Sequence, residues 1–114
     1  MVTDCPFCRI VAGDIPADVL HSTEDVLAFR DLHPAAPTHV LIIPKKHVES
    51  IEQLTEHQAP LLSHLFNAAN HVARAEGLRD GWRLVANVGP AGGQTVFHLH
   101  LHLLGGRQMT WPPG

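Results

Sequence analysis

The chain has 114 residues, 45% of them hydrophobic, so it is long enough for one domain with a core and too short for two. Its formal net charge of −3, with the histidines neutral, argues against a basic surface for DNA or RNA polymers, but not against binding of one small phosphate compound. No apolar run reaches the roughly 18–20 residues of a membrane span, and Met1 to Asp4 show no leader pattern. We expect one domain, residues 1–114, in the cytoplasm and without a membrane contact.

Two cysteines, Cys5 and Cys8, form a C-x-x-C pair near the start of the sequence. In an intracellular protein this spacing favours a metal half-site or a redox pair over a structural disulfide. The neighbouring residues predict a short helix over 5–12, with Asp4 as its N-cap and Gly13 as its stop.

Several apolar segments predict β-strands, and one long segment predicts a helix. The helix covers residues 57–76, where apolar residues recur every three or four positions. Its start is ambiguous, because Thr55 and Gln58 resemble a capping box, whereas Pro60 would then lie beyond the first turn. Strands without β-α-β alternation indicate an α+β fold with an antiparallel sheet. The predicted strands are residues 19–21, 26–31, 39–43, 82–88 and 96–104.

Histidines and leucines alternate in the stretch His98-Leu99-His100-Leu101-His102-Leu103-Leu104. In a strand, this alternation places three imidazoles on one face and the leucines in the core. Imidazole can donate, accept, titrate, attack or bind a metal. The preceding loop, Gly92-Gly93-Gln94-Thr95, would on its own be typical of a turn, but its N–H groups can cradle an anion. Together, the two stretches indicate an anion held beside imidazoles.

This loop and the alternating histidines resemble the signature of the histidine triad (HIT) superfamily. Other matching segments, together with the C-terminal end, resemble its Hint branch, the histidine triad nucleotide-binding proteins. The resemblance implies a five-stranded antiparallel sheet with a long helix and a short N-terminal helix, and a homodimer across which the sheet continues. The matching segments are Ile15-Pro16-Ala17, Leu27-Ala28-Phe29, Ala36-Pro37-Thr38-His39, Ile43-Pro44-Lys45-Lys46-His47 and Trp111-Pro112-Pro113-Gly114.

The resemblance also implies a hydrolase that cleaves the P–N bond of purine nucleoside 5′-phosphoramidates of the AMP or GMP type. His100 holds the position of the nucleophile, which forms a nucleotidyl-imidazole that water then hydrolyses. Neutral imidazole is a good nucleophile near pH 7, so the chemistry needs no cofactor. His98 and His102 flank it and bind phosphate oxygens or protonate the leaving amine, and His39 matches a supporting fourth histidine.

A nucleotide pocket follows from the same resemblance. Asp31 matches the acid that binds the ribose hydroxyls, and Gln94 and Thr95 would hold phosphate oxygens, although the family often has serine in place of Thr95. Trp111 either reaches the site of the other subunit or packs on its own. The apolar base pocket, whose aromatic members fit a plain core equally well, and the polar positions beside it are Phe7, Ile10, Phe29, Leu32, Asn87 and Gly93.

The cysteine pair departs from the best-known Hint proteins. Other members of the superfamily with such a pair hold a structural zinc, and the corresponding positions here are Cys5, Cys8, His47 and His98. Two cysteines and two histidines are a normal closed zinc set. A zinc on His98 would remove that residue from direct acid–base work.

Other functions stay open at this stage. Alternate histidines with His39 could ligate one catalytic metal, as in a metalloenzyme. The chain could also be a nucleotide-binding regulatory module with weak catalysis. A dinucleoside polyphosphate hydrolase of another HIT branch is the alternative chemistry.

Overall fold

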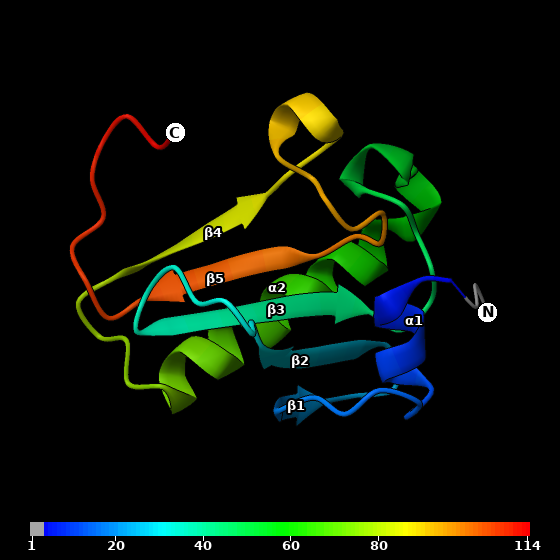
Figure 1. Cartoon of the computed structure of the whole chain (residues 1–114), viewed down its shortest axis with the longest axis horizontal. Helices are drawn as coiled ribbons and strands as arrows, with labels where there is room; N and C mark the ends of the chain where they lie inside the picture. The colour runs from blue at the N-terminus through cyan, green and yellow to red at the C-terminus, as the bar shows by residue number, and fades with distance from the viewer. Residues whose placement is uncertain (1–3) are drawn as a thin grey trace.

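A computed structural model describes residues 4–114 and contains a five-stranded antiparallel sheet with the strand order β1-β2-β3-β5-β4 (Figure 1). The expected α+β fold, with one long and one short N-terminal helix, is confirmed. The prediction of no leader falls on residues 1–3, which lie outside the described residues, and no described helix is long and apolar enough to cross a membrane. The elements are α1 (Pro6–Val11), β1 (Val19–Ser22), β2 (Val26–Arg30), β3 (Thr38–Pro44), α2 (Ala59–Ala75), β4 (Trp82–Ala86) and β5 (Leu101–Gly105), with the short 3₁₀ turns η1 (Ile51–Gln53), η2 (Glu56–Gln58) and η3 (Pro90–Gly92).

The strand that carries the histidines is shorter than predicted. We expected residues 96–104, but β5 begins only at Leu101. Both neighbouring strands set this limit, because the ladders end where Leu101 pairs with Ile42 of β3 and with Ala86 of β4. Ahead of β5, the N–H of Leu99 instead bonds to a carbonyl in the loop after β3, at 2.6 Å. β4 correspondingly ends at Ala86, two residues earlier than predicted.

Both helices start differently from the sequence prediction. Cys5, not Asp4, caps α1, because its Sγ accepts a backbone N–H from the first turn. The start of α2 was ambiguous in the sequence because a separate 3₁₀ turn, η2, directly precedes the helix. The capping bond from the N–H of Thr55 to Gln58 belongs to η2, and Pro60 lies in the first turn of α2, where its missing N–H costs nothing.

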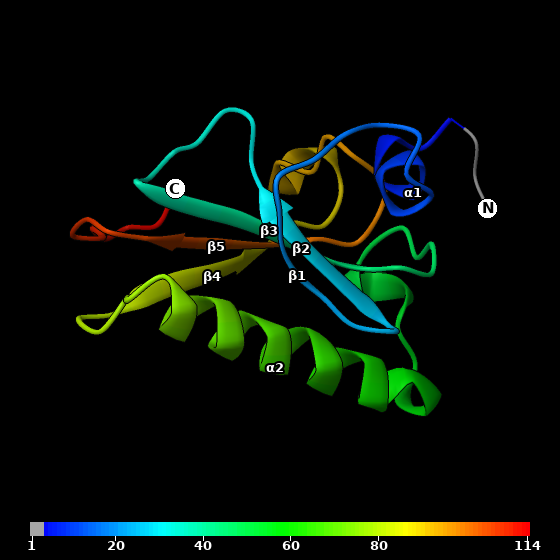
Figure 2. The same ribbon diagram turned by 90° about the horizontal axis from the view of Figure 1, so that it is seen from below.

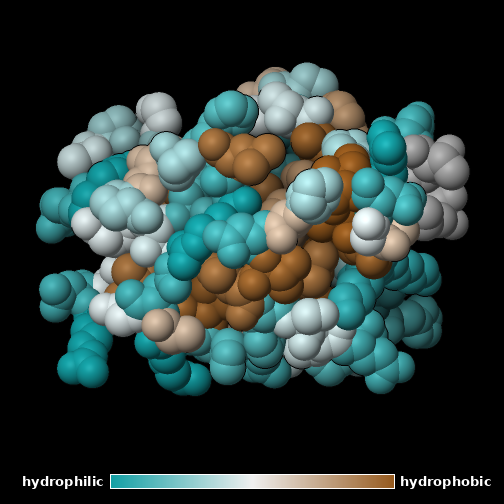
Figure 3. Space-filling view, turned by 60° about the horizontal axis from the view of Figure 1, so that its bottom comes forward, coloured by the Kyte–Doolittle hydropathy of each residue, from teal (hydrophilic) through white to brown (hydrophobic). Residues whose placement is uncertain are grey.

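Figure 2 shows that α2 covers one face of the sheet, whereas α1 and the loop around η3 lie on the other face. Side chains of α1 pack with alternate residues of β2 and β3 in a buried cluster. Figure 3 shows hydrophobic side chains in a broken band across the middle of the molecule, from the N-terminal end inward. The buried members of the α1 cluster are Cys5, Phe7, Cys8, Leu27, Phe29, Leu41 and Ile43.

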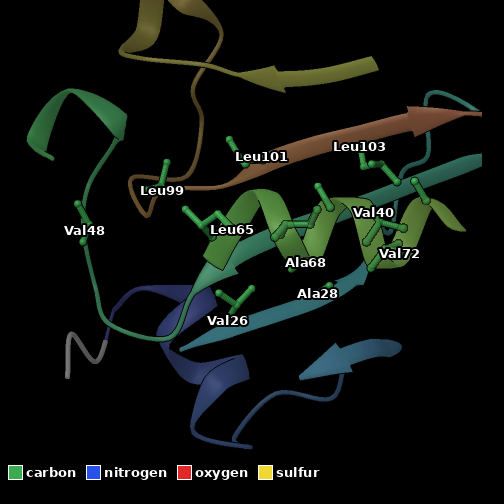
Figure 4. Packing of buried hydrophobic residues seen from close by; sticks show 13 residues of the cluster. Val26, Ala28, Val40, Val48, Leu65, Ala68, Val72, Leu99, Leu101 and Leu103 are labelled. Atoms are coloured by element: carbon green, nitrogen blue, oxygen red, sulfur yellow. The ribbon is translucent and has the colours of Figure 1, made fainter. Parts of the chain in front are cut away.

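The main core lies between the sheet and α2 (Figure 4). Leu99, Leu101 and Leu103 are all buried there, against the apolar stripe of α2. Burial of each leucine is worth about 1.5–3 kcal/mol, so these residues hold the stretch to the helix. The histidines of this stretch face the α1 side of the sheet, where the ring centroid of Phe7 lies 5.9 Å from that of His98 and 5.2 Å from that of His100.

Candidate active site

The three histidines of the row are used differently, although they share one face. The side chain of His98 is fully buried, with 0% of its surface exposed, and it lies next to the cysteines of α1. His100 lies in the middle and His102 in β5, and their ring centroids are 4.9 Å apart. The row therefore connects two polar clusters, one at each end.

The first cluster, which we call the cysteine cluster, consists of Cys5, Cys8, His47 and His98. All four ligand atoms lie within 4.8 Å of one another. Nδ1 of His98 is 3.4 Å from Sγ of Cys5, 3.6 Å from Sγ of Cys8 and 3.2 Å from Nδ1 of His47. Sγ of Cys8 is 3.3 Å from Nδ1 of His47. The structure thus brings together the four residues that the family resemblance had grouped.

These distances match a tetrahedral zinc site. With ordinary Zn–S and Zn–N bonds, neighbouring ligand atoms are about 3.3–3.8 Å apart. Nε2 of His98 is 2.8 Å from the carbonyl of Pro44, to which it donates its proton, so Nδ1 presents a bare lone pair to the cluster. Burial also lowers the pKa of His98, which favours the neutral, ligating form of the ring. The donor set fits zinc in identity and spacing, and His98 has the protonation state of a ligand.

His100 is fixed in one tautomer by a backbone contact. Its Nδ1 lies 2.7 Å from the carbonyl oxygen of His98 and donates a proton to it. In the neutral ring, Nε2 then carries the lone pair. Burial lowers the pKa of His100, although the hydrogen bond to His98 and the charge of Asp31 oppose this change. His100 is therefore a neutral imidazole with an unprotonated Nε2.

At the other end of the row, His102 pairs with His39 of β3. Nε2 of His39 is 2.9 Å from Nδ1 of His102. Nδ1 of His39 already accepts the N–H of Ala35 at 3.0 Å, so the proton of His39 is on Nε2 and is donated to His102. Nδ1 of His102 accepts, and its proton is consequently on Nε2. Oδ2 of Asp31 lies 3.5 Å from Nε2 of His39, and we call these three side chains the histidine relay.

Burial keeps the two histidines of the relay uncharged at neutral pH. Burial, followed by the neighbouring His100 and His39, lowers the pKa of His102 to about 4, while the charge of Asp31 acts in the opposite direction. Burial likewise lowers the pKa of His39, again opposed by Asp31. Desolvation disfavours imidazolium in both cases. His102 therefore offers a hydrogen-bond donor from a neutral ring.

The glycine loop forms a closed turn. The N–H groups of Gly92 and Gln94 bond to the carbonyl of Gly89, at 3.1 and 3.0 Å, so they are not directed at an anion. The side chain of Gln94 is buried and accepts the N–H of Gly89 at 2.9 Å. Its amide nitrogen donates to the carbonyls of Glu49 and Val96, at 2.7 and 3.0 Å. In this structure Gln94 ties the loop to the segment that follows His47.

The residues expected around a nucleotide base lie in different settings. Phe7 is buried, with its ring centroid 5.2 Å from that of His100 and 5.5 Å from that of Phe29. Ile10 packs against the same cluster, whereas Leu32 is 88% exposed. Phe7 therefore borders the histidine face, and Phe7 and Phe29 also belong to the core.

The remaining predicted pocket residues lie on the loops and the C-terminal segment. Gly93 has a φ of +89°, which favours glycine, and a Cβ there would lie 3.6 Å from the amide nitrogen of Asn87. Thr95 is exposed and lines a cavity of about 370 Å³ beside the cysteine cluster. Trp111 is 81% exposed, and the guanidinium of Arg83 lies 5.9 Å from its ring.

Sequence reasoning missed several backbone groups that shape the site. The carbonyl of Pro44, the carbonyl of His98 and the N–H of Ala35 decide which nitrogen of each ring carries a proton. Every residue other than proline has both of these backbone groups, so no residue type marks them in a sequence.

The chain is similar to proteins of one family. Residues 12–109 match the HIT domain. A HIT family hydrolase from Legionella pneumophila has 54% sequence identity and a TM-score of 0.95, over 97% of this chain and 100% of that chain. A 14 kDa zinc-binding protein of Zea mays is 50% identical over 110 residues, 95% of this chain and 86% of its own. A histidine triad nucleotide-binding protein from Candida albicans has a TM-score of 0.83 and 30% identity, over 96% and 83% of the two chains.

Proposed function

Because the chain belongs to the HIT domain family, we propose that it hydrolyses purine nucleoside 5′-phosphoramidates through a covalent nucleotidyl-histidine intermediate. The observation that carries the proposal is the unprotonated Nε2 of His100, which follows from the 2.7 Å bond between its Nδ1 and the carbonyl of His98. An imidazole held in this way is a nucleophile that needs no base. The names of the relatives from Legionella and Candida support a hydrolase and a nucleotide ligand.

In the proposed reaction, Nε2 of His100 attacks the α-phosphorus and the P–N bond breaks. The leaving amine takes up a proton from solvent, and Nδ1–H of the nucleotidyl-imidazolium stays bonded to the carbonyl of His98. Water then attacks phosphorus and gives up one proton to solvent, the bond to Nε2 breaks, and the nucleoside monophosphate leaves. His102 presents Nε2–H to the phosphoryl oxygens or the leaving amine, because its Nδ1 is occupied by His39. We assign His98 no direct part, since its Nε2 is bonded to the carbonyl of Pro44 and its Nδ1 faces the cysteine cluster.

For nucleotide recognition, we assign the ribose hydroxyls to Asp31 and the purine to the apolar residues beside the triad. Phe7 and Phe29 form the wall of this surface, and Ile10 and Leu32 extend it. Thr95 is the side-chain donor for phosphate, whereas Gln94 stabilises the loop through its hydrogen bonds to Gly89 and Glu49. Asn87 and Gly93 complete the polar side.

We also propose that the cysteine cluster holds one structural zinc. Cys5, Cys8, His47 and His98 would be its ligands, and the donor spacing of 3.2–3.6 Å supports this assignment. A closed site of this kind contributes folding energy and leaves no open position for substrate. The name of the Zea mays relative is consistent with zinc binding.

We further propose a homodimer. In one chain Trp111 is 81% exposed beside Arg83 of β4, which is an edge strand of the sheet. A second copy joined at this edge would continue the sheet and place Trp111 near the neighbouring site. Sedimentation equilibrium with the wild type and with Trp111→Ala tests this assignment.

Hydrolysis of an adenosine 5′-phosphoramidate in the presence of a chelator tests the function. We expect turnover by the wild type and a loss of about 10⁴-fold or more in His100→Ala and His100→Asn. His57→Ala, which removes an exposed histidine outside the site, is the matched control and should stay active. Unchanged turnover in the His100 variants would exclude the nucleophile assignment. Loss of turnover on chelation, with circular dichroism unchanged, would indicate a metalloenzyme.

A further inference from the structure

We propose that Asp31 is a positioning residue that holds the histidine relay in its working orientation, in addition to any contact with ribose. Its carboxylate holds the ring of His39 turned so that Nε2–H lies between Asp31 and His102, and this orientation keeps the proton of His102 on the nitrogen that faces the substrate. The kinetic part of this inference rests on the proposed function, whereas the arrangement of protons does not.

Asp31 is anchored to His39 in more than one way. Its backbone N–H donates to the carbonyl of His39 at 3.0 Å, just beyond the end of β2. Oδ1 accepts the N–H of His33 at 2.8 Å, which fixes the plane of the carboxylate. Oδ2 is left facing Nε2 of His39 at 3.5 Å. The side chain is 20% exposed, so one edge of the carboxylate is also open to a ligand.

The hydrogen bonds of His39 fix both the tautomer and the orientation of its ring. Nδ1 accepts from Ala35 at 3.0 Å, so Nε2 must carry the proton. That proton points between Nδ1 of His102, at 2.9 Å, and Oδ2 of Asp31, at 3.5 Å. A ring that flipped would face the N–H of Ala35 with a carbon atom and lose this hydrogen bond.

A carboxylate is needed at position 31 because it only accepts hydrogen bonds. An asparagine has nearly the same shape, and its oxygen can still accept the N–H of His33. Its NH₂ group would then face the Nε2–H of His39, donor against donor. To avoid this clash, the amide must give up the bond to His33, or His39 must turn away from His102. Asp31→Asn is therefore a selective probe of the contact between Asp31 and His39.

The first experiment measures the protonated nitrogens directly, by ¹H–¹⁵N correlation spectra of the imidazole rings at neutral pH. In the wild type we expect His39 and His102 each as a single Nε2–H tautomer. In Asp31→Asn, whose NH₂ group opposes the Nε2–H of His39, we expect a mixture of tautomers at His102, with the spectrum of the backbone otherwise intact. Asp80→Asn, which changes an exposed carboxylate on a distant turn, should leave both rings unchanged. Unchanged tautomers in Asp31→Asn would overturn the proposal.

The second experiment separates positioning from ribose binding. Turnover of an adenosine 5′-phosphoramidate is compared with that of its 2′,3′-dideoxy analogue. If Asp31 only bound ribose, Asp31→Asn and the wild type would hydrolyse the dideoxy analogue equally well, and this result would refute a positioning role. We expect instead a loss of about tenfold or more on the analogue, mainly in kcat. In a His39→Ala background, Asp31→Asn should have no additional effect on kcat for the analogue.

The two experiments distinguish an error in the proposed function from an error in the positioning role of Asp31. If the wild type hydrolyses neither substrate, the proposed function is wrong, and the imidazole spectra still decide whether Asp31 orders the relay. If the wild type is active but the spectra and the dideoxy kinetics do not respond to Asp31→Asn, the function stands and the positioning role is wrong.

Discussion

The cysteine cluster and the histidine relay are built from similar residues on the same face of one sheet, yet they have opposite chemistry. In both, three or four potential ligand atoms lie within 4.8 Å of one another. In the cysteine cluster, Nδ1 of His98 faces the other donors with a bare lone pair. In the relay, each nitrogen of His39 is committed to a hydrogen bond. The first arrangement suits a metal, and the second suits a fixed line of proton donors.

The difference comes from backbone groups outside both clusters. The carbonyl of Pro44 takes the outer proton of His98, so the inner nitrogen is free to ligate. The N–H of Ala35 occupies the outer nitrogen of His39, so the inner nitrogen must donate. A carbonyl in one place and an N–H in the other thus divide a single row of imidazoles between two roles, with His100 between them.

The largest expected effect is the loss of zinc when the cysteine cluster is broken. Cys8→Ser removes a ligand outright, so the zinc content should fall from one ion per chain to none after dialysis. The loss should exceed the roughly 10–100-fold loss of affinity that follows when only a hydrogen-bond partner of a metal ligand is removed. The midpoint of thermal unfolding should fall by about 10 °C or more. Elemental analysis and calorimetry measure both quantities.

The matched control is His39→Ala, which removes a histidine from the relay. It should keep one zinc per chain, because its ring nitrogens already have partners. Zinc lost from His39→Ala but kept in Cys8→Ser would reverse the assignment of the two clusters.

The next effect is on catalysis and comes from the relay. His102→Ala should lower kcat for an adenosine phosphoramidate by about 10²–10⁴-fold, the range of a positioned proton donor, while zinc content stays constant. Steady-state kinetics and elemental analysis on the same preparation check this prediction. A loss of zinc in parallel with activity would show that the two clusters do not act separately.

Much of this division was open to prediction from the sequence, and part of it was not. The alternation of His98, His100 and His102 with leucines predicts which face each residue takes, and the cysteine spacing predicts a metal half-site or a redox pair. The start of β5 at Leu101 depends on where neighbouring strands end, which no local pattern records. The carbonyl of Pro44 fixes the tautomer of His98 only because the fold places it beside Nε2, and no residue type in the sequence indicates this.

Acid should destabilise the protein through the relay. The fold holds the pKa of His102 at about 4, below its ordinary value of 6.5, so the unfolded chain binds more protons between these two values. Stability is therefore fully present above pH 6.5 and falls as the pH drops toward 4, by at most about 3 kcal/mol for this residue. Urea unfolding of the wild type and of His102→Gln at several pH values measures the contribution.

The two proteins should differ in the slope of stability against pH between 6.5 and 4, the wild type being the more acid-sensitive. Parallel curves would mean that His102 does not carry the acid sensitivity. The lowered pKa of His39 acts in the same direction and should remain visible in the His102 variant.

The smallest expected effect concerns Gln94, which supports the loop beside the cysteine cluster. Gln94→Leu leaves the N–H of Gly89 and the carbonyls of Glu49 and Val96 without their partner. We expect a loss of about 1–3 kcal/mol in the free energy of unfolding, with zinc retained. A loss of activity as large as that of His102→Ala would indicate instead that Gln94 contacts the phosphate.

The division of the histidine row can be tested most directly by native mass spectrometry after rapid mixing with an adenosine phosphoramidate. We predict that each wild-type chain carries one zinc and, transiently, one nucleotidyl group. The nucleotidyl group should be absent from His100→Ala, which keeps its zinc. A nucleotidyl adduct on His100→Ala, or release of zinc when the adduct forms on the wild type, would contradict the account.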